Sequence, residues 1–138
     1  MILLDTDIIT LWLLGHARLA ERVLGTTELV AITVVTRVEL LRGRFDSLLK
    51  ASDGVQLQQA QWRLDQTERE LAKLVVVPIG AKPAAAFDRL RQIRKLKKVG
   101  RADLLIAAIA LAHRATLVTR NVRDFQQIPG LILENWAD

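Results

Sequence analysis

Apolar and polar positions follow two different periods along the chain. Short apolar runs that end in polar residues are typical of buried strands, and they occupy 2–6, 28–34, 74–79, 115–119 and 131–135. Between them, apolar residues recur every three to four positions, which predicts helices that end at glycine or at polar stretches. These helices are expected at 7–15, 17–24, 35–43, 82–101 and 103–114, with two more over 45–74 that break near 52–54.

Strands that alternate with helices indicate an α/β fold. Continuous apolar strands of this kind form parallel sheets whose two faces are both covered by helices. We therefore predict a three-layer α/β/α sandwich around a central, mostly parallel sheet of four to five strands. Neither a repeat nor a linker interrupts the pattern, so a single domain is expected over 1–138.

Composition limits the class of protein. The chain has 138 residues, of which 51% are hydrophobic, so it can bury a core without covalent cross-links. It has no cysteine, which excludes disulfides and cysteine-ligated metals and fits a reducing cytoplasm. Its longest apolar run, Leu104–Ala112, is far shorter than the roughly 20 residues of a membrane span. A cytoplasmic protein without a membrane segment is expected.

The net charge of +5 is concentrated in one segment. Residues 82–101 hold eight Lys or Arg against one Asp, which leaves a charge of −2 on the rest of the chain. Read as a single helix, this segment places apolar residues on one stripe and cations on another; the cations are Arg91, Arg94, Lys95 and Lys98. The segment is either a solvated surface or a binding surface for a polyanion such as RNA or for an acidic protein.

Acidic residues stand where the predicted strands end. Asp5 ends the first strand, Glu39 lies in the helix after the second, Asp103 opens the apolar helix, and Asp124 follows the fourth strand with Asn121 before it. Because ligands of parallel sheets gather at the carboxyl ends of the strands, these side chains are expected to converge on one pocket.

Each acid also has a purely structural interpretation. Asp103 is suited to cap its helix, and Asp124 to cap the turn that follows the fourth strand. Glu39 lies among apolar neighbours, where a carboxylate is costly to bury unless it is paired with a cation. Arg37 or Arg42 could supply that ion pair.

A cluster of these carboxylates would have one natural chemical use. Like charges held together raise one another's pKa unless a cation compensates them. Oxygen ligands favour a hard ion, so Mg²⁺ is expected, with Mn²⁺ as its substitute. Such an ion activates water and neutralises charge on a phosphodiester. Acids beside a basic segment therefore suggest a metal-dependent nuclease, in which the basic side chains and Arg120 hold phosphates.

Four motifs together resemble a known family. The stretches LLDTDII, TRVELLRG, ADLLIAAIA and LVTRNVRDF occur in the order and spacing of the PIN-domain ribonucleases, and they are most similar to the VapC toxins of VapBC toxin–antitoxin pairs. The resemblance covers essentially the whole chain. It implies a three-layer fold, Mg²⁺- or Mn²⁺-dependent endoribonuclease activity, a homodimer, and inhibition by a cognate VapB-like antitoxin.

The resemblance also implies a role for particular residues. Asp5, Glu39 and Asp103 match the three acids that hold the metal. Many relatives have an aspartate where this chain has Asn121, so Asp124 is the nearby acid that could complete the metal shell. The hydroxyl residues of the first and last motifs correspond to Thr6 and Thr119.

Two other functions compete with this interpretation. LLDTDII approaches the D-x-D-x-T signature of haloacid dehalogenase phosphatases, but Ile9 stands in the threonine position and the chain is short for that fold. A catalytically degenerate PIN fold that only binds RNA or protein is the second alternative. Retention of all three core acids argues against it.

Overall fold

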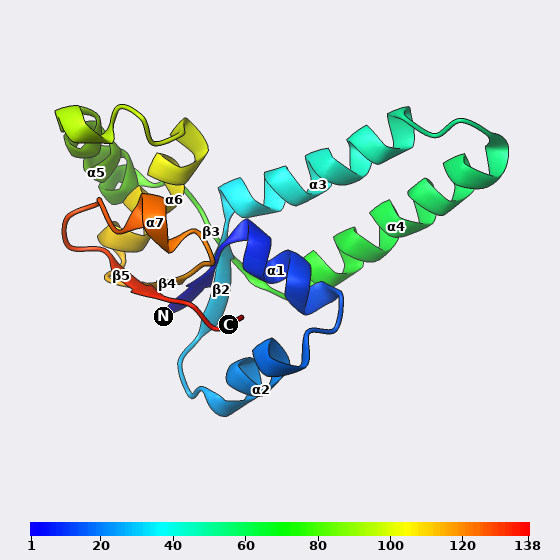
Figure 1. Ribbon diagram of the computed structural model, residues 1–138, viewed down its shortest axis with the longest axis horizontal. Coiled ribbons are helices and arrows are strands. Elements are labelled where there is room, and N and C mark those ends of the chain that lie inside the picture. The colour runs from blue at the N-terminus through cyan, green and yellow to red at the C-terminus, as the bar shows by residue number, and fades with distance from the viewer.

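A five-stranded parallel sheet forms the centre of the computed structural model, which describes residues 1–138 (Figure 1). Its strands are β1 (Ile2–Leu4), β2 (Val30–Thr33), β3 (Val75–Val77), β4 (Thr116–Val118) and β5 (Ile132–Glu134). All four neighbouring pairs are parallel, in the order β3-β2-β1-β4-β5. The five predicted strands are confirmed. Each is shorter than its apolar run because the flanking residues begin helices or turns.

Helices cover both faces of the sheet, so the predicted three-layer arrangement is confirmed. Leu3 of β1 and Leu117 of β4 pack on one side with α5 (Ala81–Arg91), α6 (Arg101–Ala112) and α7 (Val122–Phe125). Leu4 and Val118, which point the other way, pack with α1 (Thr6–Leu13), α2 (Ala17–Gly25) and α4 (Gly54–Ala72). This alternation follows from the two-residue period of a strand and explains why the strands are apolar throughout. None of the helices has the length and hydrophobicity needed to cross a bilayer.

The helix after β2 is longer than predicted. A stop was expected at Gly43, but α3 runs from Val34 to Leu49 through that glycine. Glycine inside a helix costs only about 1 kcal/mol relative to alanine, and the packing of α3 along α4 is enough to offset it. The two helices form a hairpin that projects from the sheet (Figure 1). The predicted break near 52–54 is confirmed, because Asp53 caps the start of α4.

The basic segment is not the single helix that was predicted. Helix α5 ends at Arg91, and a short 3₁₀ turn, η1 (Arg94–Leu96), leads to Gly100. The buried side chains of Leu96 and Val99 follow the half-buried Ile93 at three-residue intervals, and this is the period of a 3₁₀ turn rather than of an α-helix. The predicted stripe of Arg91, Arg94, Lys95 and Lys98 on one helical face is therefore wrong, although all four side chains are exposed.

The strand order fixes where a site can lie. The chain moves outward from β1 through β2 to β3 and then returns to place β4 on the other side of β1. The connections on either side of β1 and β4 therefore leave in opposite directions, which opens a crevice at the carboxyl ends of these two strands. Asp5 and Thr119 are the residues that immediately follow β1 and β4.

Candidate active site

Asp5 lies at the centre of the crevice and is almost fully buried, with 6% of its surface exposed. One carboxylate oxygen accepts a hydrogen bond of 2.8 Å from the backbone N–H of Thr6, so Asp5 is the N-cap of α1. The other accepts a bond of 2.7 Å from the hydroxyl of Thr119. The ends of β1 and β4 thus hold this side chain in one orientation.

Glu39 is held by hydroxyl groups rather than by a cation. The Thr6 hydroxyl donates to Glu39 Oε1 over 2.7 Å, and the same hydroxyl lies 3.0 Å from that of Thr36. No ion pair joins Glu39 to Arg37 or Arg42, so the structural alternative considered for this residue is wrong. The half-buried carboxylate of Glu39 therefore has no positive charge that compensates it.

Asp103 lies in the first turn of α6, but it does not cap that helix. The N-cap is Gly100, which provides no side-chain hydrogen bond, and Asp103 is three residues further on. The prediction that Asp103 is a helix cap is wrong. The carboxylate forms no hydrogen bond within the protein, which leaves it available for a ligand.

Asn121 and Asp124 act together after β4. The Asn121 amide donates to Asp124 Oδ2 over 3.2 Å, and its backbone N–H donates to the hydroxyl of Thr119 over 2.9 Å. Asn121 is the N-cap residue of α7 without itself forming a side-chain cap bond. This arrangement leaves Asp124 as the acid at this corner of the site, with Asn121 orienting it.

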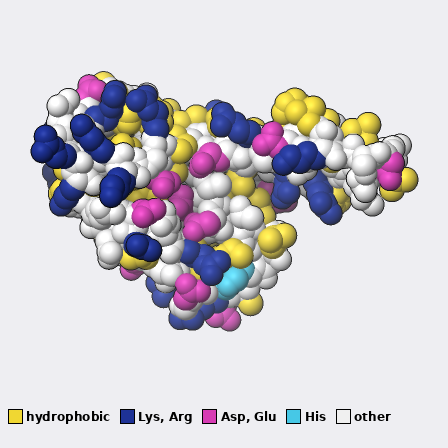
Figure 2. All heavy atoms as spheres, turned by 45° about the horizontal axis from the view of Figure 1, so that its top comes forward, with side chains coloured by type: hydrophobic (Ala, Val, Ile, Leu, Met, Phe, Trp, Pro, Cys, Tyr) yellow, Lys and Arg dark blue, Asp and Glu magenta, His cyan; other side chains and the backbone are white.

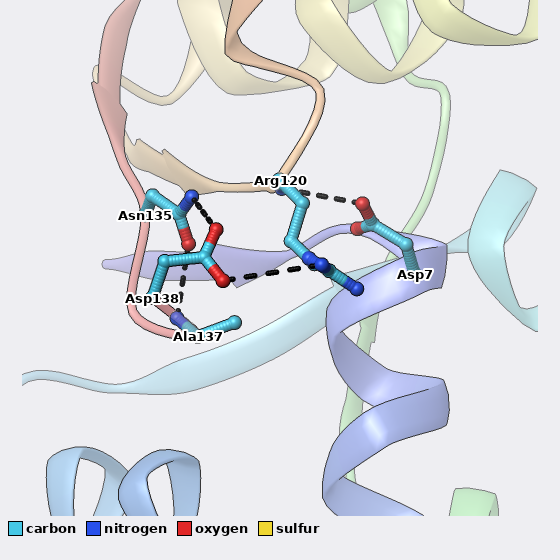
Figure 3. A network of polar contacts seen from close by, with 5 residues as sticks. All are labelled: Asp7, Arg120, Asn135, Ala137 and Asp138. Carbon is cyan, nitrogen blue, oxygen red and sulfur yellow. Dashed lines mark hydrogen bonds and ion pairs between the residues drawn. The ribbon is translucent and has the colours of Figure 1, made fainter.

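Asp7 is a further carboxylate of the crevice, and it is not among the acids that the strand-end pattern singles out. Its Oδ2 accepts a hydrogen bond of 3.2 Å from the backbone N–H of Arg120, while its Oδ1 is buried and has no partner. Figure 3 shows the Arg120 guanidinium between Asp7 and Asp138, and it lies 3.9 Å from the carboxylate of Asp138. The signal in the sequence was the spacing, because Asp7 lies in the first turn of α1, two residues after the N-cap Asp5.

The electrostatics of these groups show that they share one site. Burial raises the pKa of Asp5 to about 6 from 3.8, although the hydrogen bond from Thr119 opposes the shift, and Asp7 and Asp103 add to it. Burial also raises the pKa of Asp7. It raises the pKa of Asp103 too, and there the charges of Glu39, Asp124 and Asp7 add to the effect. Acids from α1, α3, α6 and α7 therefore repel one another across a single crevice.

The donor set fits a hard divalent cation by its chemistry. It consists of carboxylate, hydroxyl and amide oxygens, it carries uncompensated negative charge, and Asp7 Oδ1 lacks a donor. No three of the acids converge into a complete ligand set as the side chains stand. Mg²⁺ retains several waters and is commonly held by one or two carboxylates, so a complete protein cage is not required.

The raised pKa of Asp5 makes fold stability depend on pH when no metal is present. A carboxyl whose pKa is higher in the folded state stabilises the fold fully below its unfolded pKa, and this contribution is lost as the pH rises through the folded pKa. For Asp5 the window runs from 3.8 to about 6, and the loss amounts to about 3 kcal/mol.

We expect the free energy of unfolding in EDTA to fall between pH 4 and pH 7, as measured by urea denaturation. Asp5→Asn removes the titrating group and should flatten the curve. A wild-type curve that rises over this interval would show that Asp5 is not held in the charged, buried state described here.

Figure 2 shows acidic side chains gathered at the centre of one face, with Lys and Arg side chains beside them. The neighbouring cations come from the end of α5, from the turn that follows it and from the start of α6. All are exposed; they are Arg89, Arg91, Arg94, Lys95, Lys97, Lys98 and Arg101. The site therefore has a negative centre and a positive border.

Comparison with known proteins decides the family. The model of the PIN domain matches residues 2–131, which is nearly the entire chain. The chain belongs to the PIN-domain family. Ribonuclease VapC2 of Rickettsia felis is 36% identical to this PIN domain over 115 residues, which are 82% of this chain and 78% of the relative. The tRNA(fMet)-specific endonuclease VapC of Salmonella typhimurium is 29% identical over 119 residues, covering 85% and 83% of the two chains.

Solved structures agree with this assignment. A chain in the crystal structure of VapBC2 from Rickettsia felis, bound to a DNA fragment from its promoter, superposes on this PIN domain with a TM-score of 0.77. The sequence identity is 33%, and 99% of each chain is covered. The predicted resemblance to VapC proteins is confirmed, and the phosphatase alternative is excluded because the whole chain follows the PIN fold.

Proposed function

We propose that this PIN domain is an endoribonuclease that depends on Mg²⁺, with Mn²⁺ able to replace it, and that it is the toxin of a VapBC pair. One observation carries the proposal: acids that lie far apart in the sequence meet in one crevice beside an unpaired basic surface. The names of the relatives support the same activity. We expect the protein to act in the cytoplasm, where its RNA substrate is.

The residues of the crevice have distinct tasks in this mechanism. Asp5 and Asp103 would hold the ion, which would supply an acidic water and neutralise charge on the phosphate. Glu39, fixed by the Thr6 hydroxyl, would orient a water and accept its proton. Asp124, oriented by Asn121, completes the outer part of the site. Thr119 keeps Asp5 in place by its hydrogen bond.

The phosphate chain is held by positive charge rather than by base recognition. We assign this task to the exposed cations Arg91, Arg94, Lys95 and Lys98, and to Arg120, whose backbone N–H donates to Asp7 in the crevice. Contacts of this kind are independent of sequence and weaken with salt. Which RNA is cut is therefore decided by the shape of the crevice.

Cleavage of labelled RNA with and without a divalent ion tests the proposed activity. We expect endonucleolytic cleavage in Mg²⁺ or Mn²⁺, and none in EDTA because the acids alone cannot activate water. The substrates should include tRNA(fMet), which the name of the Salmonella typhimurium relative indicates as that protein's substrate. RNA that is bound in both conditions but never cut would favour the degenerate binding module instead.

We propose a VapB-like antitoxin as the protein partner and a homodimer as the assembled form. The structural relative from Rickettsia felis is a VapBC complex. The antitoxin could inhibit by placing an arginine among the carboxylates, where its charge would replace that of the metal.

A groove of about 850 Å³ between α1 and α4 offers apolar side chains to a protein partner, since Leu14 and Trp62 on its wall are largely exposed.

A further inference from the structure

Two arginines from different helices lie within cation–π distance of the Phe87 ring. The guanidinium carbon of Arg91 is 5.7 Å from the ring centroid, and that of Arg101 is 5.6 Å from it. Arg91 is one turn further along α5, whereas Arg101 is the first residue of α6. Both distances are within the range in which a guanidinium is attracted to an aromatic face. The ring therefore links the end of α5 to the start of α6.

Packing against the hydrophobic core holds the Phe87 side chain in place. Its side chain is half-buried and packs against the core cluster that α5 and α6 share with the sheet. Arg91 and Arg101 are exposed, and the three ion pairs of the structure all lie elsewhere. A guanidinium that stacks on a ring keeps its N–H groups free at the edges. Both arginines are thus oriented by an apolar contact while their hydrogen-bond donors remain available.

We propose that Phe87 is a positioning residue that holds Arg91 and Arg101 as a clamp for the RNA phosphate backbone at the border of the acidic crevice. The inference rests on the proposed function and adds to it the contact that orders part of the basic surface. Arg101 lies two residues before Asp103 in the first turn of α6. Residues two apart on a helix do not face each other, so a phosphate bound by Arg101 would lie at the border of the acidic crevice rather than beside Asp103.

The physical advantage of the clamp is preorganisation. A long exposed side chain loses rotamer freedom when it binds, at a cost of about 0.5–1.5 kcal/mol. Contact with Phe87 restricts both arginine side chains before RNA binds, so less binding free energy is spent on ordering them. The other exposed cations of the surface, such as Lys95 and Lys98, have no aromatic neighbour of this kind. Phe87 is expected to matter for RNA binding although it does not touch the RNA.

A double-mutant cycle on RNA binding in EDTA tests the clamp without requiring cleavage. The probe is a fluorescently labelled single-stranded RNA oligonucleotide, and the readout is its dissociation constant from fluorescence anisotropy. We expect Phe87→Leu to weaken binding about fivefold and Phe87→Tyr to restore it. In the Arg91→Gln/Arg101→Gln background, Phe87→Leu should have no further effect, because it acts through the two arginines.

Salt dependence and a matched control complete the design. Each of Arg91→Gln and Arg101→Gln should reduce the slope of log Kd against log salt by about 0.7, as expected for one lost phosphate contact. Arg18→Gln removes the same charge from an exposed position on α2 and should leave the slope unchanged. In cleavage assays, Phe87→Leu should raise KM while kcat stays within about twofold.

The outcomes separate the clamp from the proposed function. If wild-type protein cuts RNA but Phe87→Leu weakens binding equally with and without the two arginines, the clamp is wrong and the nuclease stands. If wild-type protein cuts no RNA, the proposed activity fails, and the binding cycle still decides the clamp. If neither arginine substitution changes the dissociation constant for RNA, the clamp is wrong, and a protein partner becomes the better ligand for this surface.

Discussion

Replacing Asp103 by asparagine is expected to lower the rate of RNA cleavage at least about a hundredfold, because a ligand of the ion contributes more than the outer groups that orient it. The fold should hardly change. Gly100 is the N-cap of α6, so the substitution removes no cap bond. The measurement is kcat in saturating Mg²⁺, with circular dichroism and urea denaturation as checks on the fold.

Asp88→Asn is the matched control for this experiment. Asp88 is an exposed acid on α5, inside the basic segment and outside the crevice, so the same loss of charge should leave kcat unchanged. Loss of the negative charge of Asp103 near the start of a helix removes a favourable interaction of about 0.5 kcal/mol, while relief of repulsion from Glu39 and Asp124 acts in the opposite direction. An Asp103→Asn protein that cuts RNA as fast as wild type would remove this residue from the chemistry.

Replacing Asp5 by asparagine should abolish RNA cleavage and raise the free energy of unfolding. Cleavage should fall below detection, since this carboxylate is the most buried of the acids and lies at the head of the crevice. In EDTA at pH 7 the variant should be more stable than wild type by about 2 kcal/mol, because a desolvated charge is removed and about one hydrogen bond is weakened. The gain in stability follows from the burial that raises the pKa of Asp5.

Addition of Mg²⁺ gives the same test a second readout. An ion that binds only the folded state raises the unfolding temperature with concentration, and it should do so for wild type but not for Asp5→Asn. The stability advantage of Asp5→Asn over wild type should therefore shrink as the Mg²⁺ concentration is raised. Differential scanning calorimetry measures this. Equal Mg²⁺ responses in the two proteins would show that the ion does not bind through Asp5.

The sequence predicted the main features of the fold because they depend on local patterns. Apolar runs such as 2–6 and 115–119 have the period and composition of buried strands whatever their surroundings. The two errors in the predicted helices both arose where tertiary packing overrides local preference. Gly43 disfavours a helix by propensity, yet α3 continues through it because α3 packs along α4. The segment after Arg91 leaves the α-helix because Leu96 and Val99 must reach the core.

The acids of the crevice could be found from the sequence for a related reason. In a parallel sheet, the carboxyl ends of all strands lie at one edge, so acids that follow different strands, such as Asp5 and Asp124, are expected at that same edge. The sequence could not show how these groups are held. The hydroxyl of Thr36 is buried beside Thr6 and Glu39, and nothing in the local pattern distinguishes it from any other polar residue of a helix.

By itself, the amino-acid sequence determined that this chain forms a parallel α/β sandwich, that its acids stand at strand ends, and that its positive charge is confined to one segment. Only the tertiary structure decided that β4 lies beside β1, that Asp7 joins the acids, that Asp103 is free of any capping role, and that Arg91 and Arg101 both lie within cation–π distance of Phe87. The physical reason is range. Periodicity and propensity act between neighbours in the chain, whereas desolvation and side-chain stacking depend on groups that folding alone brings together.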